Sequence, residues 1–186
     1  MAVDVVTDVV IARPPQAVAA FAADAIPLYE LSFSLAEKAN GAGAAVMLIV
    51  RIQGARGHFA EIRKATLDGG DISPAHLLVS AAEGIAVALG VSTVLGIGND
   101  EQLSKSSIDK AGCLFDYDAF WESLGGRPRR GWFQFDAPYA PRPLSQTPAH
   151  NRRHKRRKRL IKAAVKEHVT AEFLTRYARQ AAAQGT

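Results

Sequence analysis

The chain has 186 residues, of which 48% are hydrophobic and 22% charged, enough for one domain with a substantial core and short for two. Its longest apolar run, residues 44–50, is far below the roughly 18 residues that a membrane-spanning helix needs. No charged and then apolar leader opens the chain, which excludes a transmembrane or exported protein. The single cysteine, Cys113, excludes an internal disulfide and a multi-thiolate zinc site. We therefore expect a cytoplasmic protein.

The net charge of +5 is unevenly distributed along the chain. Residues 151–186 contain 11 Lys and Arg against 2 Asp and Glu, whereas residues 1–150 contain 12 against 16. The body therefore carries −4 and the tail +9. The high isoelectric point describes the tail, so it does not indicate that the body itself binds polyanions.

The first residues alternate like a half-buried strand. Valines and Ile11 alternate with polar residues until Pro14 ends the pattern, and residues 17–23 are predicted as a short helix. This strand and helix resemble the start of START-like, polyketide-cyclase-type lipid-binding domains. Because nothing downstream continues that fold, we treat residues 1–28 as a separate leader and infer no lipid cavity.

Two strands joined by a turn follow the leader. Residues 29–35 alternate as a strand, residues 38–43 favour a turn, and residues 45–52 form a more apolar strand. A glycine turn at 53–57 and a helix at 58–67 come next, because apolar residues of the second segment are spaced for one helical face.

Helices and strands alternate in the rest of the body. Ser73 is expected to be the N-cap of a helix that has proline in its first turn and ends at Gly90. Residues 91–97 are β-branched and nearly all apolar, which predicts a buried strand. An aromatic helix closed by Gly125-Gly126, a strand at 132–135, and a basic helix at 152–179 complete the pattern.

These elements predict an α+β (or α/β) fold. A β-hairpin leads into a mixed sheet flanked by helices, and a basic helix forms the C-terminus. The predicted division is a strand–helix leader at 1–28, a globular core at 29–138, a proline-rich connector at 139–150 and a basic helical tail at 151–186.

Several separated blocks within residues 29–168 resemble the VirK/YbjX family. They are YELSFSL, VRIQGARGHFAEIRKAT, SPAHLLVSAAEGIAVALGV, GIGNDEQLSKSS, FDYDAFWESLGG and HNRRHKRRKRLIK. The resemblance implies a bacterial cytoplasmic protein associated with virulence, stress, survival of cationic antimicrobial peptides and envelope-related phenotypes. It implies no defined reaction, so a molecular activity has to be inferred from the residues. Family members usually carry a longer N-terminal region, in whose place this chain has the leader.

The glycine turn is a candidate cofactor site. Its amides stand at the start of a helix, where unpaired N–H groups and the helix dipole favour a phosphate. The turn resembles the acyl-CoA pyrophosphate turn of GNAT acyltransferases, although an arginine stands where that pattern has its first glycine. Asn99 and the aromatic helix also resemble GNAT elements. The resemblance implies a GNAT-like fold in which CoA or an acyl-CoA is held by Gln53, Gly54, Arg56 and Gly57.

A GNAT-like acyltransferase would need a base near neutral pKa and an acid for the departing thiolate. His58, Glu61 or His76 could be the base and Tyr117 the acid, and we take His58, Glu61 and Tyr117 as the catalytic candidates. The alternative is structural. In that case the histidines and Glu61 are exposed helix residues, and Tyr117 belongs to the core.

The polar loop after the strand at 91–97 is a second candidate site. Ligands collect at the carboxyl ends of strands in open α/β sheets, and the family resemblance also passes through this loop. Asn99, Gln102 and Ser104 are its candidate ligand residues. The alternative is a plain surface loop.

The basic run is the third candidate site. Eight of the eleven residues 152–162 are Lys or Arg, enough to bind the phosphates of RNA, DNA or anionic lipid. The run could bind RNA and regulate expression after transcription, contact an anionic membrane peripherally, or dock on the acidic body. The polyanion-binding candidates are Arg152, Arg153, Lys155, Arg156, Arg157, Lys158 and Arg159. No metal site is expected, since the i, i+4 pair of His150 and His154 lies among arginines.

Overall fold

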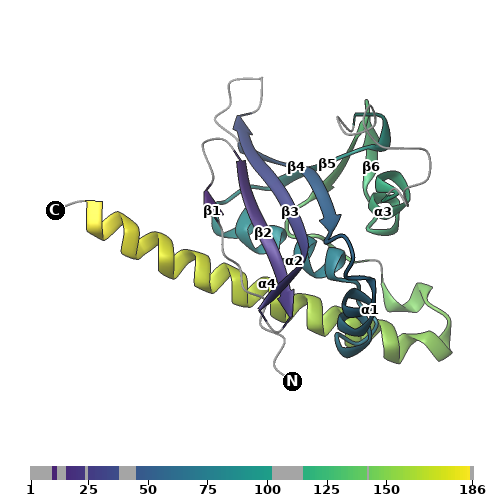
Figure 1. The fold of residues 1–186 in the computed structure, drawn as a ribbon. Coiled ribbons are helices and arrows are strands. Elements are labelled where there is room, and N and C mark those ends of the chain that lie inside the picture. Colours follow the sequence, from purple (N-terminus) through teal and green to yellow (C-terminus); the bar gives the residue numbers. More distant parts are fainter. Residues whose placement is uncertain are drawn as a thin grey trace.

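The computed structural model describes residues 10–11, 16–23, 25–37, 45–101, 115–141 and 143–184. Within them, seven strands form one mixed sheet in the order β1-β2-β3-β4-β5-β7-β6, and helices flank it (Figure 1). The predicted α+β class with a hairpin is therefore confirmed. The strands are β1 (Val10–Ile11), β2 (Gln16–Ala23), β3 (Ile26–Glu37), β4 (Ala45–Gly54), β5 (Thr93–Ile97), β6 (Arg127–Arg129) and β7 (Trp132–Asp136).

The helix predicted at residues 17–23 is wrong, because this segment forms strand β2. Its alanine-rich composition favours a helix locally, but the segment pairs antiparallel with β3 along its whole length. Ala19 and Phe21, two residues apart, are 0% and 1% exposed, the period of a strand with one buried face. Pairing and burial thus outweigh the local propensity.

The predicted hairpin is confirmed as β3 and β4, which pair antiparallel with Leu31 opposite Ile52 and Leu35 opposite Met47. The turn predicted at 38–43 lies outside the described residues. Alternate side chains of both strands point into the core, including Leu31, Met47 and Ile52. The apolar period of two thus fixes which face of the sheet is covered.

A helical crossover joins β4 to β5. It contains α1 (Phe59–Asp68) and α2 (Pro74–Ala88), which begins after the predicted N-cap Ser73. The crossover makes β4 and β5 parallel, from Val46 opposite Thr93 to Ile49 opposite Gly96. Eleven of the 15 residues of α2 are buried, because one side faces the sheet and the other is covered by the C-terminal helix.

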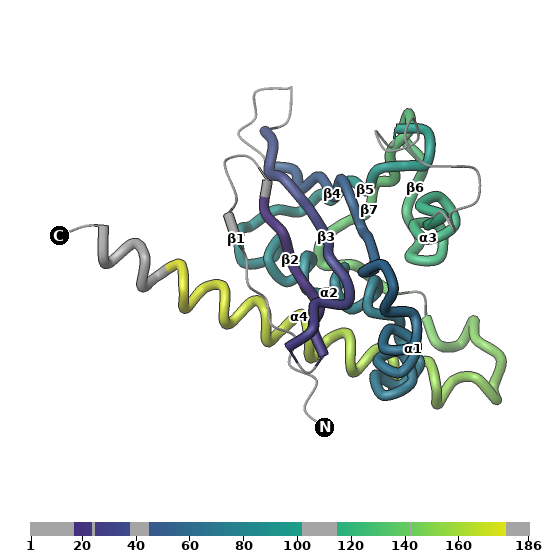
Figure 2. The backbone as a smooth tube through the Cα atoms, viewed as in Figure 1, coloured from purple at the N-terminus to yellow at the C-terminus, as the bar shows by residue number. Residues whose placement is uncertain are grey.

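The C-terminal helix α4 (Ala149–Gln184) packs along α2. Figure 2 shows it crossing the molecule on the helical side of the sheet and extending beyond it. Ile161, Val165 and Val169 recur on the face that joins the core. Thr170 donates a hydrogen bond of 3.0 Å to the carbonyl of Gly84, so the two backbones approach closely there. Although α4 has 36 residues, no helix in the described ranges is apolar enough to cross a membrane.

The last part of the sheet is closed by α3 (Tyr117–Ser123). Trp121 is fully buried and donates a hydrogen bond of 2.8 Å to the carbonyl of Ile97. Its ring occupies the place that a side chain at Gly96 would need.

Strand β6 was not predicted, because its three residues are all exposed and pair only with β7. Two 3₁₀ turns, η1 (Asn99–Glu101) and η3 (Leu144–Gln146), lie in the connections.

Gly84→Val is expected to loosen α4 from α2. A Cβ at Gly84 would lie 2.6 Å from the carbonyl oxygen of Lys166 and 3.3 Å from Val169. Overpacking of this kind costs about 1–3 kcal/mol, measured as the free energy of unfolding in urea. The matched variant Ala164→Val, at an exposed position of α4, should cost only the helix-propensity difference of about 0.6 kcal/mol. Equal losses in both variants would contradict the close approach.

Candidate functional site

The glycine turn at residues 53–57 lies between β4 and α1, as predicted. The amide of Ala55 donates a hydrogen bond of 2.9 Å to the carbonyl of Leu28 in β3. Gly54 is required by packing, because a Cβ there would lie 2.9 Å from the ring of Tyr29. Gly57 is required by conformation, since its φ is +82° and the space around it is open. Both glycines therefore have structural reasons that involve no ligand.

The start of α1 is open rather than enclosed. The first helical hydrogen bond runs from the amide of Ile62 to the carbonyl of His58 at 2.9 Å, so the amides of residues 59–61 precede the ladder. Phe59 is 75% exposed, and the side chain of His58 caps none of these amides. Gln53 is held by Arg51, whose Nε donates to its side-chain oxygen at 2.7 Å.

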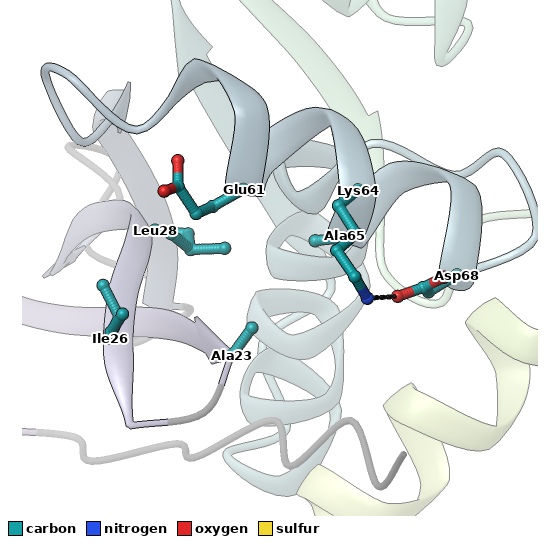
Figure 3. A pocket seen from close by; sticks show the side chains of 7 residues that line it. All are labelled: Ala23, Ile26, Leu28, Glu61, Lys64, Ala65 and Asp68. Carbon is teal, nitrogen blue, oxygen red and sulfur yellow. Dashed lines mark hydrogen bonds and ion pairs between the residues drawn. The ribbon is translucent and has the colours of Figure 1, made fainter.

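A small cavity of about 70 Å³ lies on the inner side of α1 (Figure 3). Ligand pockets for drug-sized molecules are about 300–1,000 Å³, so a CoA molecule does not fit in this one. Figure 3 shows the aliphatic side chains pointing into it and Lys64 paired with Asp68. It is lined by Ala23, Ile26, Leu28, Glu61, Lys64, Ala65 and Asp68.

The structure brings two of the three catalytic candidates together. Nδ1 of His58 lies 3.8 Å from the carboxylate of Glu61, and the two side chains are 39% and 49% exposed. Tyr117 lies at the start of α3, where its hydroxyl contacts Ile52 of β4 rather than this pair. Its ring packs against Phe115 with centroids 4.9 Å apart.

The Tyr117 hydroxyl closes the junction between β4 and β5. The parallel pairing ends at Ile49 and Gly96, whereas β4 continues to Gly54. Beyond that point the Tyr117 hydroxyl donates to the carbonyl of Ile52 at 2.9 Å and accepts from its amide at 3.0 Å. Burial raises the pKa of the Tyr117 phenol. The neutral phenol thus satisfies both backbone groups of Ile52 beyond the end of the parallel pairing.

Asn99, the first residue of the predicted ligand loop, ties β5 to α3. Its side-chain oxygen accepts from the amide of Tyr117 at 2.9 Å, and its side-chain nitrogen donates to Asp116 at 3.0 Å. The hydrogen bond from Asn99, followed by that from the amide of Ala119, lowers the pKa of Asp116. Asn99 therefore positions α3. Gln102 and Ser104 lie outside the described residues.

His76 is half-buried, in contrast to the expected exposed position. Its Nδ1 lies 2.7 Å from Oγ of Ser73, and its ring contacts Phe120 edge-on with centroids 4.9 Å apart. Burial, together with the charges of Lys162 and Lys158, lowers the pKa of His76 to about 4. The imidazole is therefore neutral near pH 7, and it belongs to the contact of α2 with α3 and α4.

The basic segment, residues 152–159, forms the beginning of α4. Residues 151–157 are all exposed, and Lys158 and Arg159 are half-buried. Arg152 donates to the carbonyl of Thr147 at 2.9 Å, and Lys158 donates to the carbonyl of Asp71 at 2.6 Å. These contacts fix the two ends of the segment against the body.

The predicted docking of the tail on the acidic body uses few of these cations. The apolar stripe of α4 makes the contact with α2, and Lys166 pairs with Glu83 at 3.2 Å. The carboxylate of Asp71 lies 3.9 Å from His154 of this segment. Most of the positive charge of the basic segment thus points into solvent.

None of the described residues form a group of three or more His, Cys, Asp or Glu side chains that could hold a metal ion. The closest arrangement of such residues on α1, His58 with Glu61, offers two ligands where zinc sites use three or four.

Tyr117→Phe should destabilise the protein by about 1–3 kcal/mol, because it leaves the buried amide and carbonyl of Ile52 without their partner. Urea unfolding measures the change. The matched variant is Tyr29→Phe. The Tyr29 hydroxyl has no hydrogen-bond partner in the described residues, and the Tyr29 ring also lies beside β4. A Tyr117→Phe variant as stable as Tyr29→Phe would show that the hydroxyl does not close the junction.

Two solved structures are similar to part of the fold. The KacTA–DNA complex matches 68% of this chain and 70% of its own chain, with a TM-score of 0.43 and 13% identity. A mutant AtaT toxin bound to the C-terminus of the antitoxin AtaR matches 66% and 67%, with a TM-score of 0.38 and 16% identity.

The sequence comparisons concern the family. The model described as "Protein of unknown function (DUF535)" matches residues 17–171, from β2 into α4. The "Uncharacterized protein YbjX" of Escherichia coli (strain K12) is 35% identical over 108 residues, which are 55% of this chain and 32% of that protein. The match therefore spans about a third of that relative's length. The resemblance noted in the separated sequence blocks is confirmed, and the chain belongs to the VirK/YbjX family.

Proposed function

We propose that the basic segment of α4 binds the phosphates of a polyanion. Seven of its eight residues are Lys or Arg, and the helix presents them within about 10 Å at 1.5 Å per residue. The observation that supports the proposal is their placement. They lie on a helix that is anchored further along by its apolar face, and Asp71 is the nearby carboxylate.

The charge density of the basic segment is unfavourable for the protein alone. Like charges three and four residues apart on a helix destabilise it by a few tenths of a kcal/mol per pair. Arg153 with Arg156 and Arg153 with Arg157 are such pairs. A polyanion would relieve this repulsion and release its counterions, which makes binding strongly salt-dependent.

The expected recognition is of phosphate rather than of sequence. The described residues include no paired recognition helix and no zinc knuckle, so base-specific readout has no support. RNA is the polyanion with which we test the surface. The virulence and stress role implied by the family resemblance remains a proposal at the level of the cell.

Replacing Arg153, Lys155 and Arg156 together by Gln should weaken binding of a single-stranded RNA by at least about tenfold at constant salt. Glutamine keeps helix propensity close to that of the lysine and arginine it replaces, so the fold should be retained. Fluorescence anisotropy of a labelled RNA measures the Kd. No hydrogen bond or ion pair ties these three side chains within the described part of the chain.

The matched control removes the same charge elsewhere. Arg51, Arg129 and Arg130 are exposed on β4 and at the β6–β7 turn, away from α4. Their replacement by Gln should change the RNA Kd by less than about threefold. Equal weakening by both triple variants would show that net charge, and not the basic segment, governs binding.

A GNAT-like acyl transfer is the second candidate. The strand order, the parallel β4–β5 pair and the glycine turn that follows β4 favour it. The residues present fit CoA only in part. The open turn with Arg56 can receive phosphates, but Tyr117 occupies the backbone groups of Ile52 at the junction, and the cavity beside α1 is small. We therefore derive no reaction step from His58, Glu61 or Tyr117.

Thermal unfolding with CoA tests this second candidate. CoA at about 100 times its Kd would add about 2.7 kcal/mol of stability and raise the Tm. Gly57→Glu should abolish the shift by placing a carboxylate beside the phosphates, whereas Gly57→Asn should keep it, because Asn tolerates the positive φ of this position. Absence of a shift in the unmodified protein would eliminate CoA as a ligand.

A further inference from the structure

Three large apolar side chains are exposed to solvent on α1 and on α4, the helix that contains the basic segment. Phe59 and Leu67 of α1 are 75% and 60% exposed, and Leu160 of α4 is 65% exposed. Among the described residues, Tyr177 is the one other large hydrophobic side chain that is more than 60% exposed. Apolar residues that gather on one face, rather than singly exposed ones, mark an interaction surface, so the placement of these three by the fold decides their meaning.

On α1 two exposed apolar residues flank one cation. Phe59, Arg63 and Leu67 are four residues apart, so they lie along one side of the helix, and all three are exposed. The two carboxylates of α1 lie elsewhere on the helix, since Glu61 and Asp68 both line the cavity on its inner side and Asp68 pairs with Lys64 at 2.6 Å. The exposed side of α1 therefore combines apolar groups with the unpaired charge of Arg63.

The turn after α1 joins this side to the basic segment. A Cβ at Gly70 would lie 3.2 Å from Ile161 and 3.7 Å from Nε of Arg157. The carbonyl of Asp71 accepts a hydrogen bond from Lys158 at 2.6 Å. Figure 1 shows α1 beside the N-terminal half of α4. Leu67 and the basic segment are thus held near each other by the fold.

On α4 the exposed Leu160 follows the basic segment directly. At 100° per residue, Leu160 lies on the same side of the helix as Arg153 and Arg157. The other apolar residues of this half of the helix, Ile161 and Val165, pack against the core instead. Helix α4 alone therefore lacks the apolar face of an amphipathic membrane helix, and α1 supplies the remaining apolar side chains.

The composition of this combined surface distinguishes between partners. Protein interfaces are depleted of charged residues at their centre, whereas here apolar and cationic side chains are interleaved. Single-stranded nucleic acid uses aromatic side chains on which bases stack, whereas two of the three apolar side chains here, Leu67 and Leu160, are aliphatic. Aliphatic and aromatic wedges among Lys and Arg are typical of proteins that lie in the headgroup region of an anionic bilayer.

We propose that the surface of α1 and the basic segment docks on an anionic lipid bilayer, with Phe59, Leu67 and Leu160 entering the acyl-chain boundary. The inference rests on the proposed function, because the same cations bind the lipid phosphates. It adds the apolar contribution, which a purely electrostatic polyanion site does not need.

Vesicle co-sedimentation tests the inference with the whole chain. Vesicles of phosphatidylcholine containing about a third phosphatidylglycerol should bind the protein, and pure phosphatidylcholine vesicles should not. The variant Phe59→Ser/Leu67→Gln/Leu160→Gln should lose at least about tenfold of its partition onto the anionic vesicles while its RNA affinity stays unchanged. As a matched control, Leu35→Thr/Val87→Thr changes exposed apolar residues on the sheet and on α2 and should bind vesicles normally.

The outcomes separate the two proposals. Binding of RNA without binding of anionic vesicles, or vesicle binding that survives the loss of the three apolar side chains, overturns the membrane inference and leaves polyanion binding in place. Binding of neither RNA nor anionic vesicles overturns both. Circular dichroism checks that the variants are folded, as expected for exposed positions whose substitution costs less than about 0.5 kcal/mol.

Discussion

The packing of α4 on α2 is the contact on which the rest of the structure depends. Helix α2 has a buried face toward the sheet and another toward α4, so neither face would be stable without its cover. The close approach at Gly84 and the stripe through Val169 hold α4 along this line. One consequence is structural and the other functional. The core is closed, and the basic segment is held at the edge of the body, where Arg152 and Lys158 fix its two ends.

The interior residues that the sequence suggested as functional are used in structural contacts. Just before the glycine turn at 53–57, where the sequence predicts a cofactor, Tyr117 bonds both backbone groups of Ile52. Asn99 uses its side chain to fix the start of α3. His76 is neutral near pH 7 and belongs to a helix contact. By contrast, Arg153, Lys155 and Arg156 are exposed, and no hydrogen bond or ion pair ties their side chains within the described part of the chain. This is why we propose a function for the surface.

The sequence could predict elements whose signal is local. The β3–β4 hairpin follows from alternation, and the start of α2 follows from Ser73 and Pro74. Strand β2 could not be predicted, because its alanines favour a helix and its pairing with β3 is a tertiary effect. The Tyr117 contact joins residues 65 apart in the chain, and no spacing rule connects them. The start of α3 had a local signal, because Asp116 precedes the aromatic helix and Asp is favoured as an N-cap. Asp116 is also the residue to which the Asn99 side chain donates.

The basic segment was identified from composition alone, but its role depended on the structure. A run of cations can be a solvated face, a docking element or a binding site. Helix α4 docks on the body through its apolar stripe and through Lys166, which pairs with Glu83. Docking therefore does not explain the exposed cations of the basic segment. Polyanion binding predicts that the affinity falls measurably as the salt concentration rises, whereas a purely structural role makes no such prediction.

The dissociation constant for single-stranded RNA, measured across a series of NaCl concentrations, tests the central claim most directly. If the seven cations of the basic segment contact phosphates, log Kd should rise with log salt with a slope of about 3 to 5, at roughly 0.7 per phosphate contact. A slope below about 1 would show that these cations do not hold a polyanion, and would contradict the account.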